Sequence, residues 1–158
     1  MPAGTYPNPQ NDYLRPHALI LLRSFTHWTG RTLIDPNLSE AEQARQLFLA
    51  PFVVLSHTTA ADPLFNYANQ MALTLFEFSW DEFMALPSRK SAEPLHQDER
   101  ARLLAQVARE GFVESFLGVR VSKTGRRFLV EKGIVWNLVD EYGSYYGQAA
   151  TFGDWSFI

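Results

Sequence analysis

A change of hydrophobic period at Phe112 divides the sequence into two parts that follow different folding rules. Beyond this residue apolar and polar side chains alternate, which is typical of strands with one buried face. Two turn sequences interrupt the alternation, at residues 123–126 and 140–143, and each contains a glycine, which tight hairpin turns favour. The pattern predicts three successive antiparallel strands beyond Phe112, joined by two hairpins.

Before Phe112 the apolar residues recur mostly at helical spacing. They predict five helices, which begin near His17, Ser39, Asn69, Ser79 and Gln97. The amide of Asn69 suits the N-cap position of its helix. Two β-branched and aromatic runs, residues 52–57 and 64–68, predict a pair of strands between the second and third helices. The order of elements defines an α+β fold: a five-stranded antiparallel sheet with helices on one face, preceded by two N-terminal helices.

At 158 residues the chain has the length of a single domain. We expect three parts in it. Residues 1–16 are rich in proline and predict a flexible tail, residues 17–50 predict a helical extension, and residues 51–158 predict the core with the sheet.

Composition excludes several functional classes. The sequence contains no cysteine, so it cannot form cysteine-based metal sites, a thiol nucleophile or a cysteinyl–flavin adduct. The net charge of −3 gives no support to nucleic-acid binding, and no apolar run is long enough to span a membrane. Without cysteines or a targeting segment, we expect a cytoplasmic protein.

Catalytic motifs are also lacking, so we expect the protein not to be an enzyme. The chain has no nucleophile-elbow motif and no phosphate-binding loop. Ser56, His57 and Asp62 supply triad residue types. However, neighbours on a strand point to opposite faces, which separates Ser56 from His57.

In the penultimate predicted strand, five apolar residues fall on one side by simple alternation: Phe128, Val130, Ile134, Trp136 and Leu138. Lys132 interrupts this side. We expect a bulge beside Gly133 to turn the lysine outward, and an ion pair with Glu131 or Glu114 is the alternative.

Four stretches of the sequence resemble PAS domains and, more narrowly, the MEKHLA domain family: PFVVLSHTTAADPLFNYANQ, SWDEFMALPSRKSAEP, GVRVSKTGRRFLVEKGIVWNLV and GQAATFGDWSFI. The resemblance runs from about Arg15 to the last residues. This PAS-related family occurs alone in bacteria and algae, and also at the C-terminus of plant class III homeodomain-leucine-zipper transcription factors. The chain is similar to the stand-alone form, because it contains no homeodomain or zipper. The resemblance implies a sensory or regulatory module. It does not extend to DNA binding, because the homeodomain is not part of the resemblance.

The resemblance also implies a ligand cavity between the inner sheet face and the short helices. We expect aromatic side chains to line it, with Arg89 and His96 at its mouth; the predicted lining is Trp80, Phe83, Phe116, Phe128 and Trp136. Arg89 could hold a carboxylate or phosphate, or be solvated. His96 could bind haem, or be a cap or surface residue. The ligand stays open between a noncovalently bound flavin and another small molecule, and the alternative is that the rings simply fill the core.

A second functional class is a ligand-free module for homodimerisation or for binding a protein partner. The first helix carries apolar residues that could form a self-complementary patch, namely Leu19, Leu22, Phe25 and Trp28. On this interpretation we expect a homodimer. The alternative is that these residues pack on the sheet of their own domain.

Overall fold

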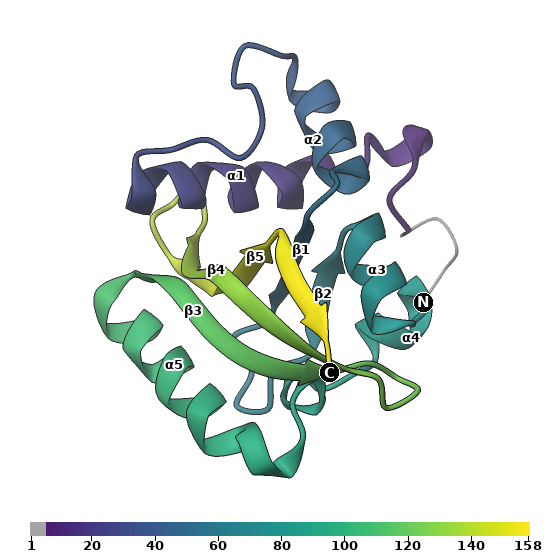
Figure 1. Cartoon of the computed structure of the whole chain (residues 1–158). Helices are drawn as coiled ribbons and strands as arrows, with labels where there is room; N and C mark the ends of the chain where they lie inside the picture. The colour runs from purple at the N-terminus through teal and green to yellow at the C-terminus, as the bar shows by residue number, and fades with distance from the viewer. Residues whose placement is uncertain (1–5) are drawn as a thin grey trace.

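A computed structural model describes residues 6–158, which form an antiparallel sheet flanked by helices (Figure 1). The helices are α1 (Arg15–Thr29), α2 (Glu40–Leu49), α3 (Gln70–Phe76), α4 (Trp80–Met84) and α5 (Gln97–Glu110). The strands are β1 (Val53–His57), β2 (Phe65–Ala68), β3 (Phe112–Val121), β4 (Arg127–Val139), β5 (Tyr145–Phe152) and β6 (Asp154–Phe157). The 3₁₀ helices within residues 6–158 are η2 (Pro9–Asn11), η3 (Ser88–Ser91) and η4 (Pro94–His96).

The sheet has the strand order β2-β1-β5-β4-β3, and every pair is antiparallel. The predicted α+β fold with five antiparallel strands is confirmed, and β6 adds a sixth strand that pairs with β4. The sequence pattern does not distinguish β6 from β5, because only Gly153 separates the two strands. Within residues 6–158, no helix has the length and hydropathy needed to cross a bilayer.

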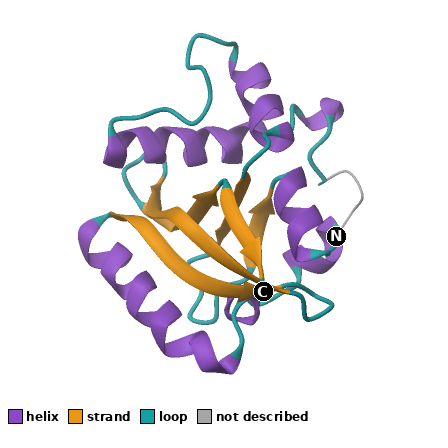
Figure 2. Cartoon of the chain, viewed as in Figure 1, coloured by secondary structure: helices purple, strands orange, loops and turns teal. Residues whose placement is uncertain are grey.

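Helices pack on both faces of the sheet, as Figure 2 shows in a second colouring. We call the face that packs against α3 and α5 the inner face, and the one that packs against α1 and α2 the outer face. Consecutive strand residues point to opposite faces. Val53 therefore belongs to the inner core, while Val54 belongs to the outer core. Helices α3 and α5 thus cover the inner face, and the N-terminal helices α1 and α2 cover the outer one. Helix α4 contributes to both cores, with Phe83 in the inner one and Trp80 in the outer one.

The apolar side of α1 is buried against the chain's own sheet. Phe25 is 2% exposed and meets Trp136 edge-on, with ring centroids 5.1 Å apart. Leu19 and Leu22 are also buried, and Trp28 is half-buried. Leu22 and Phe25 belong to the outer core, and Trp28 packs against it. The structure therefore contradicts the placement of a dimer patch on these four residues, because their apolar surface is largely used within the chain.

The described part of the predicted flexible tail is folded onto the domain. Asn8 accepts hydrogen bonds from the backbone of Gln10 and Asn11 and caps η2. Tyr6 lies edge-on to Phe48 and Trp80. Aromatic packing thus holds residues 6–14, and α1 already begins at Arg15; the prediction for residues 1–5 lies outside the described residues.

One extra residue in β3 and one in β4 interrupt the pairing of these strands. The register shifts on both sides of the Phe116–Gly133 pair, and both Ser115 and Lys132 have a φ of 56°. A β-bulge is thereby present beside Gly133, as predicted. Gly133 is required there because a Cβ atom would lie 2.3 Å from the ring of Phe116.

The bulges change which side chains face inward, because one inserted residue moves all later ones to the other face. Before Lys132, Phe128 points into the inner core; after it, Val135 points inward and Trp136 outward. The prediction that Phe128 and Trp136 share one side of β4 is therefore wrong. The bulge in β3 has the same effect, burying Phe116 and leaving Leu117 62% exposed.

Asn69 joins three elements and is fully buried. Its Oδ1 accepts from the backbone N–H of Ala72, which confirms the predicted N-cap of α3, and also from that of Val54 in β1. Its Nδ2 donates to the carbonyls of Leu47 and Phe52. One side chain thus fixes α2, β1 and α3 together.

We expect Asn69→Ala to lower the free energy of unfolding by about 3 kcal/mol or more, because several buried backbone groups lose their partners. Urea denaturation followed by circular dichroism measures this. Asn37→Ala, at an exposed position, is the control. A loss no greater than that of the control would contradict the role given to Asn69.

Candidate functional site

A cavity of about 70 Å³ lies on the inner face, between the sheet and α5. Most of its wall is apolar, and polar groups enter from β1, β3, β5, η3 and α5. Its lining consists of Leu55, His57, Phe65, Phe76, Ser91, Arg100, Leu103, Leu104, Phe116, Arg120, Val135, Gln148, Ala149, Ala150 and Phe152.

Of the residues predicted to line a ligand cavity, Phe116 does so. Phe83 and Phe128 belong to the inner core but fill it away from the cavity. Trp80 and Trp136 lie in the outer core. Trp136 points there because of the bulge in β4, and Trp80 packs there against Tyr67. The prediction that these residues line the cavity is therefore wrong for Trp80, Phe83, Phe128 and Trp136.

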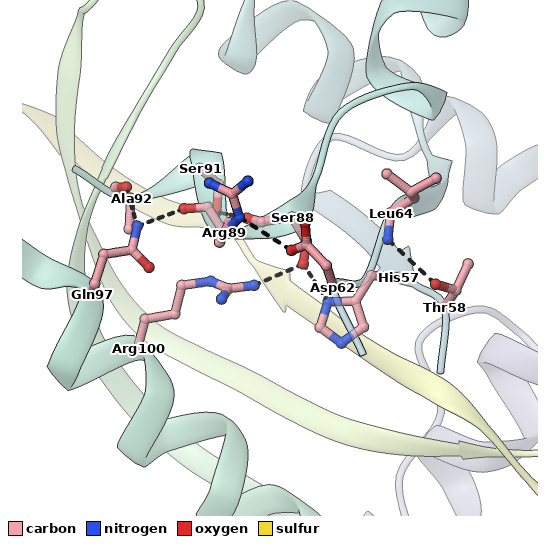
Figure 3. A network of polar contacts seen from close by, with 10 residues as sticks. All are labelled: His57, Thr58, Asp62, Leu64, Ser88, Arg89, Ser91, Ala92, Gln97 and Arg100. Atoms are coloured by element: carbon pink, nitrogen blue, oxygen red, sulfur yellow. Dashed lines mark hydrogen bonds and ion pairs between the residues drawn. The ribbon is translucent and has the colours of Figure 1, made fainter. Parts of the chain in front are cut away.

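The two residues predicted at the mouth also lie apart from the cavity lining. Arg89 is exposed and pairs with Asp62, with Nε and Oδ1 3.1 Å apart (Figure 3). His96 precedes α5 as a half-buried N-cap residue without a side-chain capping hydrogen bond. Arg89 is therefore an exposed residue with an acidic partner, and His96 occupies the N-cap position without capping the helix through its side chain.

His57 is the centre of a buried hydrogen-bond chain beside the cavity. Its Nδ1 lies 2.8 Å from Ser88 Oγ, and its Nε2 lies 3.2 Å from Gln148 Oε1. Arg100 reaches the same Ser88 oxygen from α5, donating through Nη2 at 2.8 Å (Figure 3). His57 thus connects its own strand β1 with η3 and β5, which are distant in sequence.

The hydrogen-bond partners of Gln148 determine which ring nitrogen of His57 carries the proton. The amide nitrogen of Gln148 donates to the carbonyl of Leu104 and to Asn137 Oδ1, so its oxygen faces His57. His57 therefore carries its proton on Nε2, and Nδ1 accepts from the Ser88 hydroxyl. Burial, together with the charge of Arg100, lowers the pKa of His57 to about 4, so the ring is neutral at pH 7.

Arg120 supplies a second buried guanidinium. Its side chain is 8% exposed and lies over the ring of Phe116, 5.0 Å from the centroid. Its Nη1 donates to the carbonyl of Val119 and lies 3.5 Å from Glu99 Oε1. Burial lowers the pKa of Arg120, while Glu99 opposes this effect.

Polar contacts continue from the cavity through the sheet to α1. Asn137 accepts from Gln148 with Oδ1, and its backbone carbonyl accepts from Trp28 Nε1 at 2.9 Å. Strand β1 provides a second connection. His57 faces the cavity there, while the preceding Ser56 contacts His17 Nε2 of α1 at 2.9 Å.

Sequence reasoning missed most of the polar residues of this site. Simple alternation along β3 places Arg120 on the polar side with Glu114, because a bulge such as the one at Ser115 leaves no mark in the sequence. His57 and Gln148 lie opposite each other in the pairing of β1 with β5, which sequence periodicity does not reveal. The available signal was Gln148 itself, a long polar side chain followed directly by the apolar Ala149 and Ala150.

Comparison with solved structures gives the class of the fold. The PAS domain of a Colwellia psychrerythraea protein has a TM-score of 0.61, at 13% identity over 74% of this chain and 94% of that one. A light-oxygen-voltage domain studied with a flavin analogue gives 0.59, at 16% identity over 74% and 84%. The light-state dimer of the fungal photoreceptor Vivid gives 0.57, at 14% identity over 82% and 88%. The chain therefore has a PAS-like fold.

Sequence comparison narrows the class to one family. The model of the MEKHLA domain matches residues 15–157, so the chain belongs to the MEKHLA domain family. Among its relatives are two homeobox-leucine zipper proteins of Arabidopsis thaliana: ATHB-9, 28% identical over 152 residues, and ATHB-14, 29% identical over 154. Each match covers 90% of this chain but 18% of the relative, so the chain spans less than a fifth of their length.

The residues around the cavity do not fit a flavin or a haem. The volume of about 70 Å³ is well below the roughly 300–1,000 Å³ of typical sites for drug-sized ligands. His96, the haem-ligand candidate, does not line the cavity. Residues 6–158 also contain no cluster of three or more histidine or acidic side chains suited to a metal. The cavity suits a ligand of only a few heavy atoms.

The neutral, buried His57 predicts a pH-dependent stability. The unfolded chain takes up a proton at this residue below its ordinary pKa of 6.5, whereas the folded protein does so only near 4. The free energy of unfolding should therefore fall as the pH drops from 6.5 towards 4, with about 3 kcal/mol from His57 at about 1.4 kcal/mol per pKa unit.

Urea denaturation at several pH values measures this slope in the parent protein and in His57→Gln. We expect a shallower slope in the variant, whatever its absolute stability. His27→Gln, at an exposed position of α1, is the matched control. Equal slopes in His57→Gln and the parent would contradict the buried, neutral state of His57.

Proposed function

We propose that the chain is a non-catalytic sensory module that binds a small molecule in the inner-face cavity. The observation that carries this proposal is the wall of the cavity, where Arg100, Arg120, His57 and Gln148 bring polar groups into an otherwise apolar space. Small-molecule sites have this composition, with few polar groups that orient the ligand and apolar groups that bury it. The PAS-like fold of the MEKHLA family supports the same function.

The hydrogen bonds that lead away from the cavity support the sensory part of the proposal. A ligand that contacts Gln148 would act on Asn137, whose carbonyl holds the indole of Trp28 in α1. Helix α1 lies on the opposite face of the sheet (Figure 1). Binding on one face can thus bias the packing of a helix on the other.

The geometry of Ser88 supports a binding role rather than catalysis. Ser88 and His57 form the hydrogen bond of a nucleophile–base pair, at 2.8 Å. However, Ser88 is 1% exposed and does not line the cavity. Its oxygen also accepts from Arg100, which draws electron density away from a nucleophile.

Ligand binding should be visible at Trp28, which lies outside the cavity lining. In ¹⁵N-correlation NMR spectra, a panel of short carboxylates, amides, alcohols and amino acids is added to the full chain. We expect at least one compound to shift the amides of Leu55, Gln148 and Ala150 together with the indole N–H of Trp28. Ala150→Leu should abolish these shifts, because the added side chain fills the cavity.

Ala60→Leu is the matched control, since it adds the same atoms at an exposed loop position. It should bind like the parent. Shifts that survive in folded Ala150→Leu would place the ligand elsewhere. A panel without any shift at the cavity would contradict the proposed function.

A homodimer stays a prediction of the sequence. It is supported by the dimer of Vivid, a fold neighbour, and no longer by α1, whose apolar side is internal. Sedimentation equilibrium of the full chain, with and without a compound that shifts Trp28, measures it. We expect a dimer mass; a monomer mass at all accessible concentrations under both conditions would contradict the prediction.

A further inference from the structure

The two guanidinium groups of the cavity wall carry more positive charge than their surroundings neutralise. Arg120 is paired with Glu99, at 3.5 Å, whereas Arg100 forms no ion pair within residues 6–158. The two arginines also repel each other: burial and the charge of Arg120 lower the pKa of Arg100 to about 10. Glu99 and Asp62 oppose this effect, and Arg100 is still protonated at neutral pH. Asp62 is itself paired with Arg89, and His57 is neutral. Arg100, Arg120 and Glu99 together therefore leave an excess of one positive charge beside the cavity.

Glu99 neutralises this charge incompletely. Its Oε1 lies 3.5 Å from Arg120 Nη1, longer than the roughly 2.7–2.9 Å of a strong charge-assisted hydrogen bond. Its Oε2 is buried and has no hydrogen-bond partner within the described chain. A loosely held carboxylate beside two guanidinium groups indicates a local charge arrangement that an incoming anion can improve.

Donor groups remain available on both arginines. The hydrogen bonds that the described residues make with Arg120 leave from Nη1, and the one from Arg100 leaves from Nη2. The rest of each planar fork can still donate, and a carboxylate matches that geometry with two oxygens. Arg100 and Arg120 both line the cavity, so these donors reach the same space.

The remaining wall sets the rest of the ligand. Leu55, Phe76 and Val135 line the cavity with apolar side chains that offer no hydrogen-bonding group. The body of the ligand must therefore be apolar. A volume of about 70 Å³ is about half of the roughly 150 Å³ of an engineered cavity that holds benzene. The ligand therefore has a short, unbranched or singly branched body.

We infer that the cavity is selective for small monocarboxylates, with the carboxylate at Arg100 and Arg120 and a short alkyl chain against Leu55, Phe76 and Val135. This inference rests on the proposed function and names its ligand class. It requires a negative charge on the ligand, which a neutral molecule of the same shape lacks.

The matched pair butyrate and butyramide tests the requirement for charge. Each is titrated into the full chain at constant ionic strength and followed by the amide shifts of Leu55, Gln148 and Ala150. We expect butyrate to bind at least about tenfold more tightly, the effect of a hydrogen bond to a charged group in a buried site. In the series from acetate to octanoate, affinity should pass through a maximum at a short chain.

Three variants on or near α5 separate ligand binding from general electrostatics. Arg100→Gln should weaken butyrate binding at least about tenfold and leave butyramide unchanged. Arg102→Gln removes the same charge from an exposed position of the same helix and should leave both affinities unchanged. Glu99→Gln should strengthen butyrate binding, because it removes the carboxylate that competes for Arg120; a merely structural role of Glu99 would not produce this gain.

The outcomes distinguish this inference from the proposed function. Equal binding of butyrate and butyramide, lost in Ala150→Leu, would overturn the selectivity for carboxylates and keep the cavity as a ligand site. Equal loss of butyrate binding in Arg100→Gln and Arg102→Gln would also overturn it, because general charge would then explain the affinity. If no member of the carboxylate series binds, the inference fails, while the wider panel still decides the proposed function.

Discussion

One inserted residue in β4 decides which side chains reach the inner face of the sheet. Lys132 adopts a left-handed backbone conformation, and beyond it Val135 instead of Trp136 points inward. The matching insertion at Ser115 brings Phe116 against Gly133 and Arg120 towards the cavity. Without this pair of insertions a tryptophan would occupy the inner face, and the outer core would lose the ring that packs against Phe25.

The polar groups around His57 are acceptable inside a core because they satisfy one another. His57, Ser88, Gln148 and Asn137 form a continuous chain in which each side chain fixes the orientation of the next. Buried polar groups without partners are costly, so such a network rigidifies its surroundings. The same network contacts α5 through the carbonyls of Leu104 and Val107. The site is thus ordered before any ligand arrives, and that lowers the cost of binding.

The sequence predicted the order of the elements, since periodicity, caps and glycine turns are local signals. Asn69 and the helix that begins at Ser79 are examples, because their capping partners lie three residues away. The site was predicted poorly because it depends on strand register. Phe116 was identified by type alone, while Trp80 and Trp136 were assigned to the wrong face. Arg100, Arg120 and Gln148 converge only through tertiary packing, and no local pattern marks them.

The contact between Phe116 and Gly133 has a consequence for how proteins of this shape can diversify. The ring of Phe116 forms part of the cavity wall, yet it has no hydrogen bond in the chain that connects Gln148 to Trp28. Size selection and signal output therefore reside in different residues. A smaller side chain at position 116 would admit a bulkier ligand, while the indole of Trp28 would keep its hydrogen-bond acceptor. Ligand size could therefore change through one residue without changing the contact to α1.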